Sequence, residues 1–419
     1  MPRNLLLLVA IFSVGCAKSS SDSEQAVPAD GQSSKTIEPL TQDQIAQGWV
    51  RLFDGESLFG WHATDADADD AVTWEVKDGS IVGSEGGKSL LMTHVPFGDF
   101  DLQFQYKLEE GGNSGVFLRS KANPKDPTVD CYELNFCDTH AEYKTASLVG
   151  RTQPEEPVSG DGDWQSVKVR CLGNQIIASW NGKEVLNFRD ESENFRNSGF
   201  IGLQKNAGKI EFKNVSLKPL RLESLVFDDT LVGWREVPGS KSEFKLKDSK
   251  IHVTNGRGYL ETEKTWGDFV LQGEVMTHGD ALNSGIFFRA MPGTEKDPAN
   301  GYEYQIQNAY EDDDRTKPAD FGTGGIYRRV KARKVVSNDK EWTYLTLVAV
   351  GPNIATWVNG EPVVAWTDDR EPDENPRKGL RTEPGHISLQ GHDPTTNLEF
   401  SNLRVAEIAT PFTNAVEDE

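Results

Sequence analysis

Residues 98–119 read GDFDLQFQYKLEEGGNSGVFLR, and residues 267–289 read GDFVLQGEVMTHGDALNSGIFFR, with one inserted residue. Both begin with a run such as Phe100-Asp-Leu-Gln-Phe-Gln-Tyr, in which apolar and polar residues alternate. A period of two is typical of a strand that buries one of its faces. Each stretch therefore predicts a long strand followed, after Asn-Ser-Gly, by a second strand that ends at Arg119 or Arg289.

The two stretches belong to a repeat that covers most of the chain. Four further blocks pair in the same order: 51–61 with 225–234, 132–136 with 302–306, 163–188 with 341–366, and 199–217 with 385–405. The numbering offset is 170 at Arg119 and Arg289, and 178 at Trp164 and Trp342. Such a steady offset indicates a tandem duplication. We expect a first domain at 48–221 and a second at 222–409.

Short strands dominate both copies. Val167-Lys-Val-Arg-Cys and Ile210-Glu-Phe-Lys alternate like the opening stretch, and no long segment holds a helical period. Asn181-Gly182 and Asn359-Gly360, flanked by strand-like runs, predict two-residue hairpin turns. We therefore predict an all-β protein of two tandem β-sandwich, or jelly-roll, domains.

Length and charge narrow the class of protein. A chain of 419 residues with 36% hydrophobic residues is long enough for two packed cores. The formal net charge of −22 argues against nucleic acid or an anionic membrane surface as a partner, because both repel an acidic protein.

The N-terminus predicts export. Arg3, the apolar run 5–12 and the small residues before Cys16 are typical of a signal peptide over 1–16, with an apolar run too short to span a bilayer. The small-small-Cys ending resembles a bacterial lipobox, which would place a lipid on Cys16; a secretory signal with an incidental cysteine is the alternative. With Ala17 after the cysteine, we expect an outer-membrane anchor facing the periplasm or cell surface.

The regions outside the two domains have the composition of disordered segments. Residues 17–47 form an expected disordered tether, and 410–419 an acidic tail. Three further cysteines remain, of which Cys131 and Cys171 could pair across neighbouring strands or be buried as thiols. No cysteine and histidine spacing predicts a zinc site.

One short strand presents a repeated carboxylate. In 132–136, Tyr132, Leu134 and Phe136 face one way, and Glu133 and Asn135 the other. The second copy repeats this arrangement, with Glu303 and Gln305 on the polar face. A solvated strand face would give the same pattern, but a carboxylate beside an amide in both copies favours a site.

A second candidate cluster surrounds the Asn-Ser-Gly motifs. Asn113 and Ser114, and Asn283 and Ser284 in the second copy, lie at an ordinary turn sequence that could also hold sugar hydroxyls. The guanidinium of Arg119 or Arg289 would then lie beside the glutamate, suited to an oxyanion, or would pair with it structurally.

Several familiar active sites are missing from the sequence. There is no nucleophile elbow, phosphate loop or dinucleotide fingerprint. Glu133 and Asp138 are five residues apart, so they lie on opposite strand faces, and local spacing does not support a two-carboxylate glycosidase.

Several motifs of the first copy occur together in one known family. They are Gly-Trp61, Gly-Asp-Phe-Asp-Leu, Asn113-Ser-Gly-Val-Phe-Leu-Arg119, Tyr132-Glu133 and Gly199-Phe-Ile-Gly-Leu-Gln204. In this combination the chain resembles the 3-keto-disaccharide hydrolase domain family. The resemblance covers nearly all of both repeats. It implies a concanavalin A-like sandwich and action on sugars in which the C3 hydroxyl has become a ketone. The ketone acidifies the C2 proton, so one base and one enolate stabiliser suffice for elimination at C1, and water then adds.

The copies depart from the family pattern in different ways. The second keeps Tyr302-Glu303-Tyr-Gln305, Tyr327 and Gln390-Gly-His392 but has Asn308 in place of an Asp. The first keeps Asp138 but has Asn135, Val149 and Lys205-Asn206 at the other positions. His392 is a candidate base, a candidate metal ligand or merely polar. We therefore expect the second copy to be the catalyst and the first to be a divergent sister that binds glycan.

These patterns lead to one principal hypothesis and two rivals. The principal hypothesis is an exported hydrolase of 3-keto-disaccharides or 3-keto-glycosides. The rivals are a carbohydrate-binding lipoprotein and a cell-surface scaffold. The partners expected are a carbohydrate and, through the lipid alone, a membrane. No cofactor or metal ligand is assigned, although a divalent metal is compatible with the chemistry.

The candidate site consists of the catalytic residues Glu303, Glu133 and His392 and the substrate-binding residues Arg289, Arg119, Asn283, Ser284, Asn113, Ser114, Tyr302, Tyr132, Gln305, Tyr327, Gln390, Gln204 and Asp138.

Overall fold

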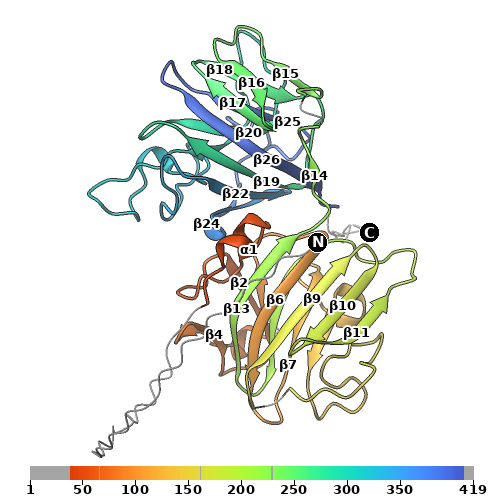
Figure 1. The fold of residues 1–419 in the computed structure, drawn as a ribbon. Coiled ribbons are helices and arrows are strands. Elements are labelled where there is room, and N and C mark those ends of the chain that lie inside the picture. Colours follow the sequence, from red (N-terminus) through yellow and green to blue (C-terminus); the bar gives the residue numbers. More distant parts are fainter. Residues whose placement is uncertain (1–37, 66, 161, 228–229, 410–419) are drawn as a thin grey trace, which may run out of the picture. The chain divides into compact units, whose positions relative to one another are not determined.

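The structure, a computed structural model, describes residues 38–65, 67–160, 162–227 and 230–409. The first copy is built from a sheet in the order β11-β10-β9-β6-β13-β4-β3, with β1 on β13, and a sheet in the order β2-β5-β12-β7-β8 (Figure 1). Its strands are β1 (Val50–Arg51), β2 (Trp61–Asp65), β3 (Trp74–Lys77), β4 (Ser80–Gly83), β5 (Ser89–Thr93), β6 (Phe100–Leu108), β7 (Asn113–Ser120), β8 (Tyr132–Phe136), β9 (Gln165–Leu172), β10 (Gln175–Trp180), β11 (Lys183–Arg189), β12 (Phe200–Ala207) and β13 (Ile210–Pro219).

The second copy repeats this topology strand for strand. Its sheets run β16-β17-β26-β19-β22-β23-β24, with β14 on β26, and β15-β18-β25-β20-β21. Its strands are β14 (Glu223–Ser224), β15 (Trp234–Glu236), β16 (Glu243–Lys247), β17 (Lys250–Thr254), β18 (Gly258–Thr262), β19 (Phe269–Thr277), β20 (Ser284–Ala290), β21 (Tyr302–Ile306), β22 (Thr343–Val350), β23 (Asn353–Val358), β24 (Glu361–Thr367), β25 (His386–Gly391) and β26 (Asn397–Glu407). Both copies are therefore sandwiches of an eight-stranded and a five-stranded antiparallel sheet, and the predicted fold class is confirmed.

Helices are short in the described residues. They are α1 (Gln42–Ala46), α2 (Pro127–Asp130), η1 (Ala68–Asp70) and η2 (Ala319–Phe321). None of them is long and apolar enough to cross a membrane. The expected signal peptide, Cys16, residues 17–37 of the tether and the acidic tail lie outside the described residues, whereas the rest of the expected disordered tether contains the capped helix α1.

The two hairpin turns form as the sequence predicts. Asn181 and Gly182 join β10 to β11 with φ of 48° and 85°, and Asn359 and Gly360 join β23 to β24 with φ of 51° and 77°. Two consecutive residues with positive φ are the signature of the turn that matches strand twist. Asparagine and glycine tolerate that conformation better than other residues.

Alternation along each strand decides which side chains form the core. In β6, Phe100, Leu102, Phe104, Tyr106 and Leu108 are buried between the sheets, while the residues between them are half-buried. The cysteines Cys131, Cys137 and Cys171 are free thiols and buried, so a Cys131–Cys171 disulfide does not form. Burial raises the pKa of Cys171 to about 12, which keeps it protonated and unreactive.

Candidate active site

A cavity of about 450 Å³ lies on the face of the five-stranded sheet that points away from the core of the first copy. Every strand of that sheet contributes to its wall, including Gln204 from β12 and Glu133 from β8. As predicted, Glu133 and Asn135 share this face, while Tyr132, Leu134 and Phe136 point into the core. In the first copy, the carboxylate of this strand therefore lines a cavity and does not lie on a solvated surface.

Glu133 is held in an environment that keeps it from ionising easily. It is 5% exposed, and its Oε1 accepts a hydrogen bond from Nε2 of Gln204 at 2.9 Å. Burial raises the pKa of Glu133 to about 7, and the Gln204 amide and the positive charge of Lys88 oppose that rise. A carboxylate with a pKa near neutrality is suited to proton transfer.

The glycine of the Asn-Ser-Gly motif makes room for this carboxylate. A Cβ on Gly115 would lie 2.9 Å from the carbonyl oxygen of Leu134 and 3.4 Å from Oε1 of Glu133. In the second copy, a Cβ on Gly285 would lie 2.9 Å from Cγ of Glu303. The motif thus contributes to the site through the absence of a side chain on β7 and β20.

The cavity of the first copy is lined by three basic residues that the sequence analysis missed, Lys88, Lys125 and His140. His140 Nδ1 accepts the backbone N–H groups of Glu142 and Tyr143 at 3.1 and 2.8 Å. The neutral ring therefore carries its proton on Nε2 and is a donor there. Lys88 lies just before β5, where its position beside a strand start could have suggested a site residue, but the loop gave no signal for His140.

In the second copy, the equivalent carboxylate has a charged partner. Glu303 is also 5% exposed, and its Oε2 lies 3.2 Å from Nη2 of Arg377. Burial raises the pKa of Glu303 to about 7, with Arg377 and His392 opposing the rise and Asp320 adding to it. The sequence analysis identified His392 here but neither Arg377 nor Asp320.

Two amide side chains near Glu303 are connected by a hydrogen bond. Gln305 donates from Nε2 to Oδ1 of Asn283 at 3.1 Å and to Oδ2 of Asp320 at 3.2 Å. Gln390, the counterpart of Gln204, lies 3.5 Å from the hydroxyl of Tyr259 instead of bonding the glutamate. The predicted residues Asn283, Gln305 and Gln390 thus belong to the polar face of the second five-stranded sheet.

His392 and Tyr327 lie at the edge of this group. His392 is exposed, its Nδ1 lies 2.9 Å from Oδ2 of Asp393, and its charge acts on Glu303. Tyr327 is half-buried, donates its backbone N–H to the carbonyl of Glu303, and packs its ring edge-on against Phe321. Its counterpart Val149 lines the cavity of the first copy.

The expectation that Arg119 and Arg289 bind substrate is wrong. Both are fully buried, and both have a left-handed backbone, with φ of 49° and 46°. That conformation interrupts the strand alternation and turns each side chain away from the glutamate. Arg119 bonds the carbonyls of Gly98, Gly173 and Arg196 and the carboxylate of Asp99, and Arg289 makes the equivalent bonds. Each arginine ties loops together.

Five other predicted substrate ligands are also structural. Tyr132 and Tyr302 lie in the cores, and their hydroxyls donate to Asp190 and Asp368 at 2.6 Å. Ser114 and Ser284 are fully buried and donate to the backbone carbonyls of Gln204 and Gln390. Asp138 accepts bonds from Thr145, Ser159 and the backbone of Gly160, which fixes a loop. These side chains shape the domain without facing the cavity.

Four amide oxygens on these sheet faces are buried without a hydrogen-bond partner in the described residues. They belong to Asn113 and Gln204 in the first copy and to Gln305 and Gln390 in the second. A buried acceptor without a donor is costly, so a ligand that supplies hydroxyl donors would be favoured there. Among the residues the structure describes, no three His, Cys, Asp or Glu side chains are grouped to hold a metal ion.

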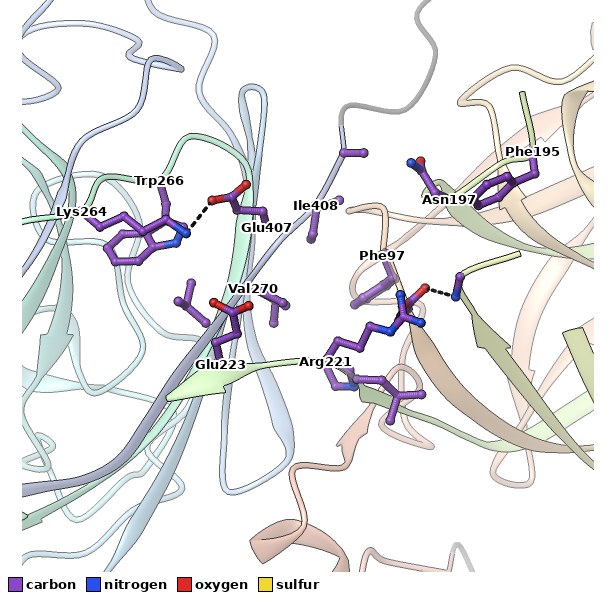
Figure 2. Close-up of a pocket in the computed structure, with 18 residues that line it drawn as sticks. Phe97, Phe195, Asn197, Arg221, Glu223, Lys264, Trp266, Val270, Glu407 and Ile408 are labelled. Carbon is purple, nitrogen blue, oxygen red and sulfur yellow. Dashed lines mark hydrogen bonds and ion pairs between the residues drawn. The ribbon is translucent and has the colours of Figure 1, made fainter. Parts of the chain in front are cut away.

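A second hollow of about 450 Å³ surrounds the linker residues 219–223 (Figure 2). Four of the charged side chains that line it are paired: Lys264 contacts Glu407 at 3.0 Å, and Arg221 contacts Asp99 at 3.1 Å. Neither Glu133 nor Glu303 lines it. The sheet-face cavity is therefore the candidate active site.

Comparison with known proteins agrees with the duplicated fold. Residues 48–218 and 223–406 each match the 3-keto-alpha-glucoside-1,2-lyase-like domain. A 3-keto-disaccharide hydrolase of Bacteroides thetaiotaomicron is 23% identical over 250 residues, which are 45% of this chain and 85% of that protein.

Two solved structures show the same kind of coverage. A putative glycosyl hydrolase from Parabacteroides distasonis is 23% identical and aligns with 44% of this chain and 100% of its own, with a TM-score of 0.39. The carbohydrate binding module CBM66 from Bacillus subtilis is 18% identical over 38% of this chain and 95% of its own, with a TM-score of 0.30. Because the family match covers both copies almost completely, the chain belongs to the 3-keto-α-glucoside-1,2-lyase-like family, as a tandem pair of its domains.

Proposed function

We propose that this protein is a hydrolase that cleaves the glycosidic bond of 3-keto-disaccharides or other 3-keto-glycosides. The observation that carries the proposal is the buried glutamate at the same place in each copy, with a pKa raised to about 7. The family description names a 1,2-lyase, and the curated relative is named a hydrolase of 3-keto-disaccharides. The family description supports chemistry between C1 and C2 of an oxidised sugar, and the name of the relative supports cleavage of a 3-keto-disaccharide.

The reaction needs one base and a stabiliser for one negative charge. The ionised glutamate takes the C2 proton, and the C2–H electron pair moves to make an enolate on the C3 oxygen. The enolate then re-forms the ketone, a C1–C2 double bond forms, and the C1–O bond breaks, so the aglycone leaves as an alkoxide that takes up a proton. Water adds across C1 and C2, with its hydroxyl on C1 and a proton on C2, and the net result is hydrolysis.

The amide oxygens without partners support a sugar as the ligand. Gln305 and Gln390 in the second copy, and Asn113 and Gln204 in the first, offer buried acceptors to hydroxyl donors. A hydroxyl that binds there satisfies an acceptor that otherwise lowers stability. A ligand with several hydroxyl groups fits this arrangement better than an apolar one.

We also propose that the protein acts outside the cytoplasm, anchored by a lipid on Cys16. Cells grown with a labelled fatty acid should incorporate label into the wild-type chain and none into a Cys16→Ser variant. Label that stays in the variant would remove the proposed attachment point, while an unlabelled wild type would remove the anchor.

The enzymatic proposal is tested with a 3-keto-disaccharide and the purified protein without residues 1–16. We expect release of both monosaccharides, and exchange of the C2 proton in D₂O. The Glu133→Gln, Glu303→Gln double variant should show neither. If the wild-type protein binds the sugar but gives no cleavage and no exchange, the protein is a binding module and the proposal is wrong.

A further inference from the structure

The second copy contains two insertions relative to the first, and each provides a charged side chain beside Glu303. The numbering offset between the copies is 170 at Asp138 and Asn308 but 178 at Thr145 and Thr323. These positions are equivalent, because each threonine hydroxyl donates to the side chain of its partner. Eight extra residues therefore lie between Asn308 and Thr323, in the loop that contains Asp320.

The second insertion lies in another loop. The offset is 178 at Asp190 and Asp368 and 185 at Arg196 and Arg381. Hydrogen bonds again show that these positions are equivalent. The hydroxyl of Tyr132 bonds Asp190 and the backbone of Arg196. The hydroxyl of Tyr302 makes the same two bonds, to Asp368 and the backbone of Arg381. Seven extra residues therefore separate these anchors, and Arg377 is located in that segment.

The guanidinium of Arg377 is held at the site and partly open. Its Nε donates to the carbonyl of Ala299 at 2.7 Å, and its Nη2 lies 3.2 Å from Oε2 of Glu303. Its planar group lies over the ring of Phe287, 5.3 Å from the ring centre. About one third of the side chain is exposed. The arginine is thus fixed from one side and keeps donors for a ligand.

The loop with Asp320 orients the neighbouring amides. Asp320 and Phe321 have φ of 40° and 75°, a strained conformation for residues other than glycine. The strained turn places Oδ2 of Asp320 2.6 Å from Nδ2 of Asn283 and 3.2 Å from Nε2 of Gln305. Because both amide nitrogens are used in this way, the oxygen of Gln305 remains an acceptor.

We propose that Arg377 is the catalytic residue that holds the C3 oxygen in the second copy while that oxygen becomes an enolate; this inference rests on the proposed function. C2–H and C3=O are on adjacent carbons, so a base and a cation already in contact can reach both. Glu303 gains the C2 proton, the electron pair moves to the C3 oxygen, and Arg377 stays protonated. Its charge is in place before the enolate forms, which lowers the reorganisation needed.

The first copy provides a different environment for its glutamate. There Gln204 donates to Glu133, and the positive charge that opposes the rise in its pKa is that of Lys88. An ammonium on a flexible chain is a weaker and less directional partner than a fixed guanidinium. The inserted arginine therefore makes the second copy the stronger stabiliser of the enolate.

The test uses a Glu133→Gln background, so that only the second copy turns over a 3-keto-disaccharide. Arg377→Met should lower kcat about 100-fold or more with a small change in KM, and Arg377→Lys should lose less. Added guanidinium should restore part of the kcat of Arg377→Met. Lys378→Met is the matched control, because it removes the same charge from the next, exposed position, and should keep the parental kcat.

The outcomes separate this inference from the function on which it rests. If the parental protein cleaves and Arg377→Met keeps its kcat, the role of Arg377 is wrong and the function stands. If wild type cleaves but the Glu133→Gln background does not, the second copy is not catalytic and the role is again wrong. If wild type neither cleaves nor exchanges the C2 proton, both are overturned. A thermal denaturation curve for each variant shows whether a loss of kcat reflects unfolding.

Discussion

Nη2 of Arg377 lies 3.2 Å from Oε2 of Glu303, whereas the equivalent carboxylate of Glu133 accepts an uncharged amide from Gln204 at 2.9 Å. Two glutamates at the same place in the same fold therefore have partners of different charge. Burial raises the pKa of both to about 7. The difference between the copies lies in what surrounds the base, and it predicts different catalytic strengths.

The activity should depend on pH through these glutamates. A base must be ionised, so kcat/KM should rise as the pH increases from 5, reach half its maximum near pH 7 and level off about one pH unit higher. The expected midpoint is well above 4.5, the ordinary pKa of a glutamate. A pH profile of cleavage measures it, and a midpoint near 4.5 would show that neither buried glutamate is the base.

The two copies should contribute unequally. Glu303→Gln should remove most of the cleavage of a 3-keto-disaccharide, and Glu133→Gln should leave more than half, because the second copy has the fixed arginine beside its base. Turnover of the two single variants under the same conditions measures the ratio. The reverse result would make the first copy, with its open cavity, the principal catalyst.

The glycine under Glu303 should not tolerate a side chain. Gly285→Ala places a Cβ 2.9 Å from Cγ and 3.0 Å from Oε1 of Glu303 and 3.2 Å from the carbonyl of Tyr304. We expect a loss of stability of about 1–2 kcal/mol and, in a Glu133→Gln background, at least a tenfold lower kcat. Gly267→Ala, whose nearest contact is 3.4 Å, is the control. Equal kcat values for the two variants would contradict the role of Gly285.

The buried arginines should matter for folding. Arg289→Met removes the guanidinium that pairs with Asp268 and donates to three backbone carbonyls, so we expect a loss of about 3 kcal/mol or more in the free energy of unfolding. Arg170→Met, which removes a half-exposed partner of Asp101, should cost less than about 1 kcal/mol. Urea unfolding curves compare the two, and a similar small loss in both would mean that the buried arginine is not a structural tie.

The sequence predicts much of the fold because alternation, turn chemistry and the repeat agree with each other. The same alternation places Glu133 and Glu303 on the polar face correctly. It fails at Arg119, since a left-handed residue at the end of β7 reverses the direction of the side chain. A period of two cannot anticipate such a residue, so the arginine is misplaced beside the glutamate.

The sequence analysis also missed site residues that lie in loops. Asp320 and Arg377 are far from the strand motifs, and no periodicity or turn pattern marks them. The change of offset from 170 to 178 and then to 185 does show where the second copy has extra chain. An insertion in one repeat is thus a usable signal for a loop that adds a functional residue. The insertion indicates the segment, and the tertiary structure then shows which of its side chains reaches the site.

The bonds of the buried arginines suggest a practical use of this domain. Arg119 and Arg289 each bond three backbone carbonyls and one aspartate carboxylate at equivalent positions of the two copies. They do so although the loop that ends at Arg196 is seven residues shorter than the one that ends at Arg381. Chain length can change between Asp368 and Arg381 while both anchors stay in place. The domain is therefore a suitable recipient for grafted loops, and libraries confined to 369–380 that keep Arg377 could redirect it to other sugars without redesign of its sheets.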